Sequence, residues 1–167
     1  RERRKMSVRS YYKCQIGVKR RSGACSAFRL PLLGEEPAMQ RIAAIQMTSG
    51  ADKAANVATA TRWVREAAQA GATFVGLPEN FSWMGPERDR ARAAEGLAGP
   101  TLSAMAALAR ELRICLLAGS VLEQGAPNGK LYNTCALFGP DGARLAIYRK
   151  IHLFDVDVAD GATYLES

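Results

Sequence analysis

The chain has 167 residues, enough for one ordinary domain, and its 48% hydrophobic content suits a globular core better than disorder or a membrane protein. Its formal charge of +7 comes entirely from residues 1–38, which hold ten basic and three acidic residues, so the rest of the chain is neutral. The charge therefore gives the folded part no nucleic-acid-binding character, and no stretch approaches the ~20 apolar residues that span a bilayer.

Residues 1–38 are expected to form a basic, disordered leader, and residues 39–167 the folded domain. Three explanations stay open for the leader: a flexible tail, upstream frame translated ahead of a start at Met39, or an Arg-rich transit peptide. A phosphate-binding arm would need only counterion release, but aromatic interleaving and a nucleic-acid-binding module are both lacking. We expect neither nucleic acid nor a membrane as a partner.

The cysteines do not have the spacing of a metal site. They form no CxxC pair or Cys/His cluster, and His152 is the only histidine, so no zinc or other metal site is expected. Cys14 and Cys25 belong to the leader, whereas Cys115 and Cys135 lie in apolar runs and are expected to be small core residues. This pattern favours a reducing compartment, and we expect the cytoplasm.

The first folded segment has the pattern of a strand, a helix and a second strand. Residues 41–47 are apolar at nearly every position, as in a strand covered on both faces, and residues 73–77 form a second buried strand. Gly71 is expected to end the helix at residues 52–70. This unit predicts two parallel strands joined by a right-handed crossover. The apolar face of its helix comprises Val57, Ala60, Val64, Ala67 and Ala68.

A carboxylate follows the second strand. Glu79 comes directly after Pro78, which stops the strand ladder, and it therefore lies at the carboxyl end, where such units bind their ligands. The next residues, 81–86, are unusually aromatic for a surface connection. We expect this loop to form a pocket wall.

The remaining elements predict a mixed sheet. Gly99-Pro100 starts a second helix with proline at its first position. Its buried stripe is expected to comprise Leu102, Met105, Leu108, Ala109 and Leu112. Three further strands are expected at residues 114–122, 131–138 and 143–148, and the last of them runs into Lys150. Gly-rich connections at residues 125–129 and 139–142 join these strands as an antiparallel meander.

Five motifs follow one another along the chain, namely RIAAIQM at 41–47, LPENF at 77–81, LYNT at 131–134, GPDG at 139–142 and YRKIHLFD at 148–155. In this order they resemble the nitrilase superfamily of carbon-nitrogen hydrolases, and within it the amidases that act on omega-amides and deaminated glutathione. The resemblance covers about residues 40–167, which is the N-terminal half or so of the family's domain. It implies an α/β fold, a four-layer αββα sandwich truncated here to roughly its first half, and a homo-oligomer in the full-length family.

The family uses a Glu-Lys-Cys triad, and the resemblance implies roles for the matching residues. Glu79 is expected to be the general base and Lys150 the cation that faces the tetrahedral oxyanion. Glu166 matches a second glutamate that holds the lysine. The residues expected to buttress the site and border the substrate are Asn133, Tyr132 and Phe81.

The nucleophile is not expected within this chain. In the family it lies on a strand-to-turn elbow downstream of the second glutamate, whereas Cys115 and Cys135 both continue as strands. A free thiol has a pKa of about 8.5, so a nucleophilic cysteine needs a nearby cation or base, which Lys150 and Glu79 would supply.

Two residues beside Lys150 are not expected to be catalytic. His152 is a lone histidine next to a lysine motif, which favours a structural role. Arg149 could steer a substrate carboxylate, but adjacent strand residues point to opposite faces, so only one of Arg149 and Lys150 enters a pocket. We assign Lys150 to it.

The resemblance implies hydrolysis of a carbon-nitrogen bond other than a peptide bond. The substrate is a small linear amide, which is cleaved through a cysteine thioester with release of ammonia and without a cofactor. This chain alone is expected to be inactive and to expose apolar sheet surface. The alternative is a non-catalytic pseudoenzyme or a partner-binding half-domain. Omega-amide, deaminated glutathione, carbamoyl and nitrile substrates all stay open.

Overall fold

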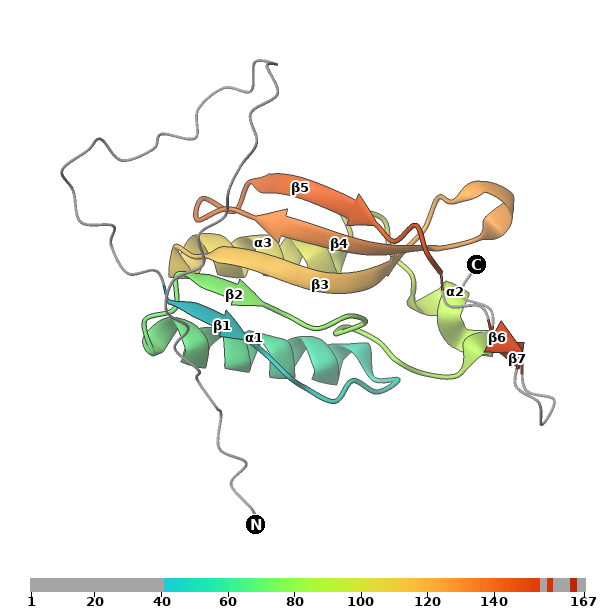
Figure 1. Cartoon of the computed structure of the whole chain (residues 1–167), viewed down its shortest axis with the longest axis horizontal. Helices are drawn as coiled ribbons and strands as arrows, with labels where there is room; N and C mark the ends of the chain where they lie inside the picture. Colours follow the sequence, from blue (N-terminus) through green and yellow to red (C-terminus); the bar gives the residue numbers. More distant parts are fainter. Residues whose placement is uncertain (1–40, 154–155, 158–162, 165–167) are drawn as a thin grey trace, which may run out of the picture.

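A computed structural model of the chain describes residues 41–153, 156–157 and 163–164. Its centre is a five-stranded sheet with the order β1-β2-β3-β4-β5. The first three strands are parallel, and the last two continue as an antiparallel meander, so the predicted mixed sheet is confirmed. Figure 1 shows the arrows of β1, β2 and β5 pointing in the same direction, opposite to the arrow of β4. The strands are β1 (Ile42–Ala44), β2 (Phe74–Gly76), β3 (Cys115–Glu123), β4 (Tyr132–Phe138) and β5 (Arg144–Arg149).

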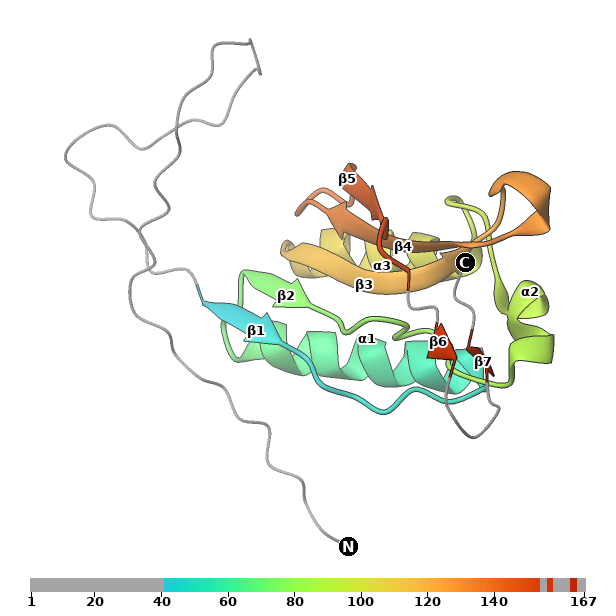
Figure 2. The same ribbon diagram turned by 45° about the vertical axis from the view of Figure 1, so that its right-hand side comes forward.

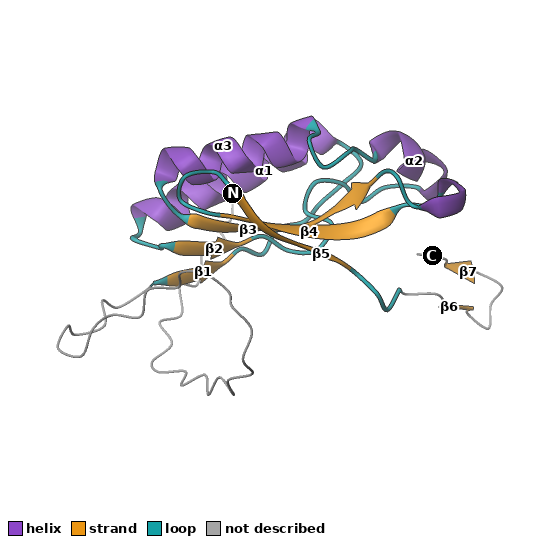
Figure 3. Ribbon diagram, turned by 90° about the horizontal axis from the view of Figure 1, so that it is seen from above, coloured by secondary structure: helices purple, strands orange, loops and turns teal. Residues whose placement is uncertain are grey.

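Two helices, α1 (Lys53–Gln69) and α3 (Pro100–Leu112), cover one face of the sheet (Figure 3). Helix α1 begins after Asp52, whose carboxylate accepts a hydrogen bond from the Ala55 amide. It ends before Gly71, where a φ of 87° gives the left-handed conformation that glycine adopts without strain. Both predicted helices, and the predicted stop at Gly71, are confirmed.

The hydrophobic core lies between the two helices and the sheet. Val64 of α1 and Met105 of α3 are completely buried against Val75 and Leu116 of the sheet. Burial of each such side chain contributes about 1.5–3 kcal/mol. Most of the predicted helix stripes are buried, namely Ala60, Val64, Ala67, Leu102, Met105, Leu108 and Ala109.

The opposite face of the sheet is not covered by any helix of the described residues (Figure 3). Ile42 is 61% exposed there, so the prediction that residues 41–47 are covered on both faces is wrong for the described part of the chain. The strand register places Ile42, Phe74 and Cys115 side by side, and Leu117 opposite Leu137. The described residues thus form one sheet layer and one helix layer, and they leave an apolar face of the sheet uncovered.

The cysteines differ from expectation in their burial. Cys115 and Cys135 lie in strands β3 and β4, as predicted, but both are half-buried and lie outside the buried core. Burial raises the pKa of the Cys135 thiol, which disfavours its thiolate.

Several short elements were not predicted. Helix α2 (Arg90–Ala93) follows a 3-10 turn at Glu87–Asp89, in a segment that has no apolar periodicity. Strands β6 (Val156–Asp157) and β7 (Thr163–Tyr164) form an antiparallel pair. Figures 1 and 2 show α2 and this pair at the end where β3 and β5 finish. No helix of the described segments is long and apolar enough to cross a membrane.

Candidate active site

The loop after β2 carries Glu79 and is tied to the neighbouring strand β3. The Leu77 amide donates to the Leu117 carbonyl at 2.9 Å, and the Asn80 amide donates to Ser120 Oγ at 2.9 Å. Asn80 has a φ of 52°, a left-handed conformation that asparagine tolerates better than most residues. The backbone around Glu79 is therefore held on both sides by hydrogen bonds.

A close approach of two backbones lies beneath this loop. The register of β3 with β4 shifts between Ala118 and Val121, and Gly119 lies inside this shift. A Cβ atom at Gly119 would lie 1.9 Å from the Pro78 carbonyl oxygen, so only glycine fits. This contact sets how near the Glu79 loop lies to the sheet.

Glu79, Lys150 and Asn133 meet at the carboxyl end of the sheet. Lys150 Nζ lies 3.1 Å from Glu79 Oε1, and Asn133 Nδ2 donates to the same oxygen at 2.9 Å. The Lys150 amide also donates to the Asn133 carbonyl at 2.9 Å, which extends the pairing of β4 with β5 by one residue. Asn133 is buried, whereas the side chains of Glu79 and Lys150 are 57% and 29% exposed. A carboxylate, an ammonium and an amide thus converge on one accessible point.

Arg149 binds a different carboxylate on the other face of the sheet. Its Nε and Nη2 donate to Glu123 Oε2 and Oε1 at 2.9 and 2.7 Å, and Thr134 Oγ1 donates to Glu123 Oε2 at 2.6 Å. The Arg149 hydrogen bonds, helped by the one from Thr134, hold the pKa of Glu123 below its ordinary value against the effect of burial. Arg149 and Lys150 therefore point to opposite faces.

The other residues that the sequence assigned to the site form no hydrogen bond or ion pair with the Glu79 carboxylate in the described part of the chain. The Phe81 side chain is completely buried in the core, and Tyr132 lies under the Arg149 guanidinium, 4.5 Å from ring centroid to Cζ. Neither observation tests the predicted contact with substrate, which stays a prediction. His152 is exposed, and Glu166 lies outside the described residues. The described residues contain no group of three His, Cys, Asp or Glu placed to hold a metal ion.

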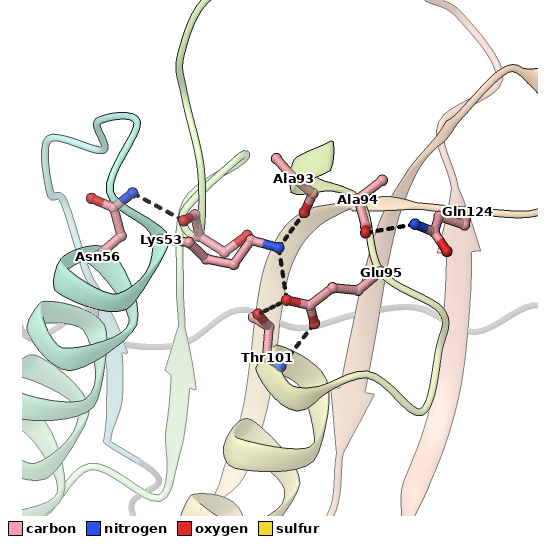
Figure 4. A network of polar contacts seen from close by, with 8 residues as sticks. Lys53, Asn56, Ala93, Ala94, Glu95, Thr101 and Gln124 are labelled. Carbon is pink, nitrogen blue, oxygen red and sulfur yellow. Dashed lines mark hydrogen bonds and ion pairs between the residues drawn. The ribbon is translucent and has the colours of Figure 1, made fainter. Parts of the chain in front are cut away.

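Sequence reasoning missed a polar network that joins both helices to the end of the sheet (Figure 4). Glu95 accepts hydrogen bonds from Lys53 Nζ at 2.7 Å, from the Thr101 amide at 2.9 Å and from Thr101 Oγ1 at 2.8 Å. The sequence feature that could have indicated this network is Gly99, which precedes α3 and has no side chain to cap the helix. Another group must therefore accept hydrogen bonds from the amides of the first helical turn.

The backbone of Glu95 also lies against β3. Its amide donates to the Leu122 carbonyl at 3.0 Å, and its carbonyl accepts from the Gln124 amide at 2.9 Å. Gln124 Nε2 adds a bond to the Ala94 carbonyl, drawn in Figure 4. Glu123 is thus anchored through both of its neighbours in the chain.

Comparison with known proteins links this chain to one family. The sequence profile of carbon-nitrogen hydrolases matches residues 41–167. Human omega-amidase NIT2 is 46% identical over 127 residues, covering 76% of this chain and 45% of the relative. A deaminated glutathione amidase from Synechocystis sp. is 40% identical over 126 residues, covering 75% and 46%. The chain therefore spans about half the length of these relatives.

Solved structures show the same fold. The C. elegans NitFhit protein aligns with a TM-score of 0.68 and 28% identity, covering 75% of this chain and 31% of that protein. An amidase from Nesterenkonia sp. aligns with a TM-score of 0.60 and 25% identity, covering 73% and 46%.

Proposed function

Because this chain belongs to the carbon-nitrogen hydrolase family, we propose that it carries the general base and the oxyanion-binding cation of an amidase that releases ammonia from a small linear amide. The observation that carries the proposal is the contact of Glu79 with Lys150 at the carboxyl end of the sheet. Two relatives described above, an omega-amidase and a deaminated glutathione amidase, support this substrate class.

In the proposed reaction, a cysteine thiol attacks the amide carbonyl and Glu79 takes the thiol proton. Among the described residues, Asn133 and Lys150 contact Oε1 of Glu79, so we assign Oε2 to accept this proton. Lys150 faces the negative oxygen of the tetrahedral intermediate. Glu79 then protonates the leaving nitrogen, ammonia departs, and water hydrolyses the thioester.

The roles of the surrounding residues follow from their contacts. Asn133 holds the Glu79 carboxylate in one orientation through its amide. Glu166 is proposed to hold Lys150 from the other side, and Tyr132 and Phe81 to border the substrate. The nucleophile is proposed to lie outside residues 1–167, because Cys115 and Cys135 are both strand residues.

The proposal extends to the assembly. A four-layer αββα sandwich would bury the open apolar face of this sheet, and further layers would join subunits in a homo-oligomer. The free thiols of Cys115 and Cys135 support a reducing compartment, which we propose is the cytoplasm.

The test measures ammonia release from a panel of short omega-amides, by this chain and by a protein extended through the downstream reading frame. We expect activity only in the extended protein. Glu79→Gln should lower kcat by about 10²-fold or more, and Lys150→Ala by about 10²- to 10³-fold. Lys130→Ala, a change of an exposed lysine in the β3–β4 connection, is the control and should have no effect.

Other outcomes would redirect the assignment. Full activity of the extended Glu79→Gln protein would reject Glu79 as the base. Activity of the 167-residue chain would mean that the nucleophile lies within it, and Cys115 and Cys135 would be replaced in turn. Inactivity of both proteins would favour a partner-binding module, which the open apolar sheet face also supports.

A further inference from the structure

The hydrogen-bonded pair of Glu123 and Arg149 lies one residue away from Lys150 along the chain. Its geometry is bidentate, with two parallel N–H to oxygen contacts of 2.9 and 2.7 Å. The Glu123 side chain is only 5% exposed, and the guanidinium stacks over the ring of Tyr132. Such a fork fixes the orientation of both partners more strictly than a single ion pair does.

The contact of Lys150 with Glu79 is weaker by comparison. Both of these side chains are partly exposed, and a long lysine side chain loses conformational freedom when it is held in one position. Exposed ion pairs of this kind stabilise little. The backbone that carries Lys150 therefore contributes to the position of its ammonium.

That backbone is fixed from the opposite face of the sheet. Along β4, Thr134 contacts Glu123 whereas Asn133 contacts Glu79, so successive residues serve the two faces in turn. The same alternation separates Arg149 from Lys150 at the end of β5. Thr134 is paired with Arg149 in the register of β4 with β5. The same two strands therefore carry the Glu123 contacts on one face of the sheet and the Glu79 contacts on the other.

The backbone at Glu123 is held in place by hydrogen bonds of its neighbours in the chain. Its chain neighbours Leu122 and Gln124 both pair with the backbone of Glu95, and the Glu95 side chain is bound to both helices. Hydrogen bonds thus connect both helices to Glu95 and Glu95 to the strand that carries Glu123. The Glu123 side chain in turn binds Arg149, the residue before Lys150.

We propose that Glu123 and Arg149 are positioning residues, which hold the end of β5 so that the Lys150 ammonium faces Glu79. The inference rests on the proposed function, because it assigns a purpose to the placement of Lys150. Neither residue touches the substrate. Loss of the pair would leave the sheet intact and allow Lys150 to turn away from Glu79.

The test measures how fast the Lys150 amine of the 167-residue chain is acetylated by limiting acetic anhydride, with quantification by mass spectrometry. Lys130, which is exposed, serves as the internal reference. Glu79→Gln removes the carboxylate that contacts Lys150 and gives the labelling rate that loss of this contact produces. In Glu123→Gln we expect Lys150 to be labelled about threefold faster than in the wild type, close to the rate in Glu79→Gln.

A matched control separates positioning from general loosening. Glu111→Gln removes the bidentate pair of Arg65 with Glu111, which joins α1 to α3 at the other end of the molecule. It should leave Lys150 labelling unchanged. Arg149→Lys keeps the charge but replaces the fork by a point charge, so it should give intermediate labelling and remains usable if Glu123→Gln does not fold.

Two outcomes would overturn the inference. Wild-type labelling of Lys150 in folded Glu123→Gln and Arg149→Lys would show that the pair has only a structural role. No change in Glu79→Gln would show that Lys150 is not held by Glu79 at all. Because labelling needs no turnover, these results are independent of whether the extended protein releases ammonia. If it does, Glu123→Gln should lower kcat and leave KM unchanged.

Discussion

Gly119 is the residue whose size most directly limits the candidate site. Its missing side chain lets β3 pass within contact distance of Pro78, immediately before Glu79. A methyl group there meets backbone atoms, which cannot move aside as a flexible side chain can. The constraint therefore acts on the position of the Glu79 loop as well as on stability.

We predict that Gly119→Ala lowers the free energy of unfolding by about 3 kcal/mol, since the added carbon would force the loop and the strand apart. Urea denaturation followed by circular dichroism measures the change. Gly76→Ala, in the adjacent strand, is the control, because no atom lies within 4 Å of the added carbon. Equal stability of the two variants would contradict the prediction.

The residues of the site differ in how far sequence could predict their arrangement. Glu79 and Lys150 follow strands that end at the same edge, so strand prediction and motif together indicate their proximity, and the structure places them in contact. Glu123 and Glu95 could not be found in this way. Their partners, Arg149 and Lys53, are 26 and 42 residues away, and no local pattern specifies which distant cation reaches a carboxylate.

Helix α3 illustrates the same point at the level of elements. Its apolar stripe and Pro100 predict where it begins and ends, but Gly99 leaves its first amides without a side-chain cap. Glu95 supplies the acceptor and at the same time binds Lys53 at the start of α1 (Figure 4). One carboxylate therefore joins the starts of both helices.

We predict that Glu95→Gln lowers the free energy of unfolding near neutral pH by about 2 kcal/mol. An amide nitrogen in place of one carboxylate oxygen would face a donor, either the Thr101 amide or the Lys53 ammonium. Urea denaturation measures the effect. Glu111→Gln, which breaks an exposed pair between the same two helices, should have a smaller effect.

The contribution of Glu95 to the free energy of unfolding should depend on pH. Burial raises the pKa of Glu95, but the hydrogen bonds from Lys53 and Thr101 outweigh it, so its pKa in the folded chain lies below the ordinary value. The stability that this carboxylate contributes is complete above about pH 5 and is lost as pH falls through the folded pKa. The difference between wild type and Glu95→Gln should shrink on acidification; a difference that grows would contradict the assignment.

The regular elements were predictable because their patterns are local. Period-3.6 stripes indicated α1 and α3, and apolar runs indicated the five strands with bounds that differ by at most three residues from those observed. Helix α2 has four residues and no stripe, so no pattern revealed it. The apolar run at residues 41–47 predicted a strand buried on both faces. In the structure β1 is an edge strand, and no described residue covers its second face. The apolar pattern alone does not distinguish these two cases.

The sheet face that the described residues leave uncovered bears on whether the molecule associates. Apolar side chains such as Leu117 and Leu137 lie on it, Tyr148 is exposed, and β1 and β5 end the sheet without a described neighbour. A contiguous apolar surface of this kind, with open strand edges, favours association. Helices α1 and α3 pack on the other face, and the described residues do not cover this one.

We predict that the 167-residue chain self-associates through this face, so that its melting temperature rises with protein concentration. Leu137→Lys, which places a charge at the centre of the face, should shift the chain toward monomer in light scattering. Ala58→Lys, at an exposed position of α1, is the matched control and should leave the association unchanged. A sharp melt of a monomer at every concentration would show that the face is covered within the chain itself, and the proposed second sheet would then not be needed to bury it.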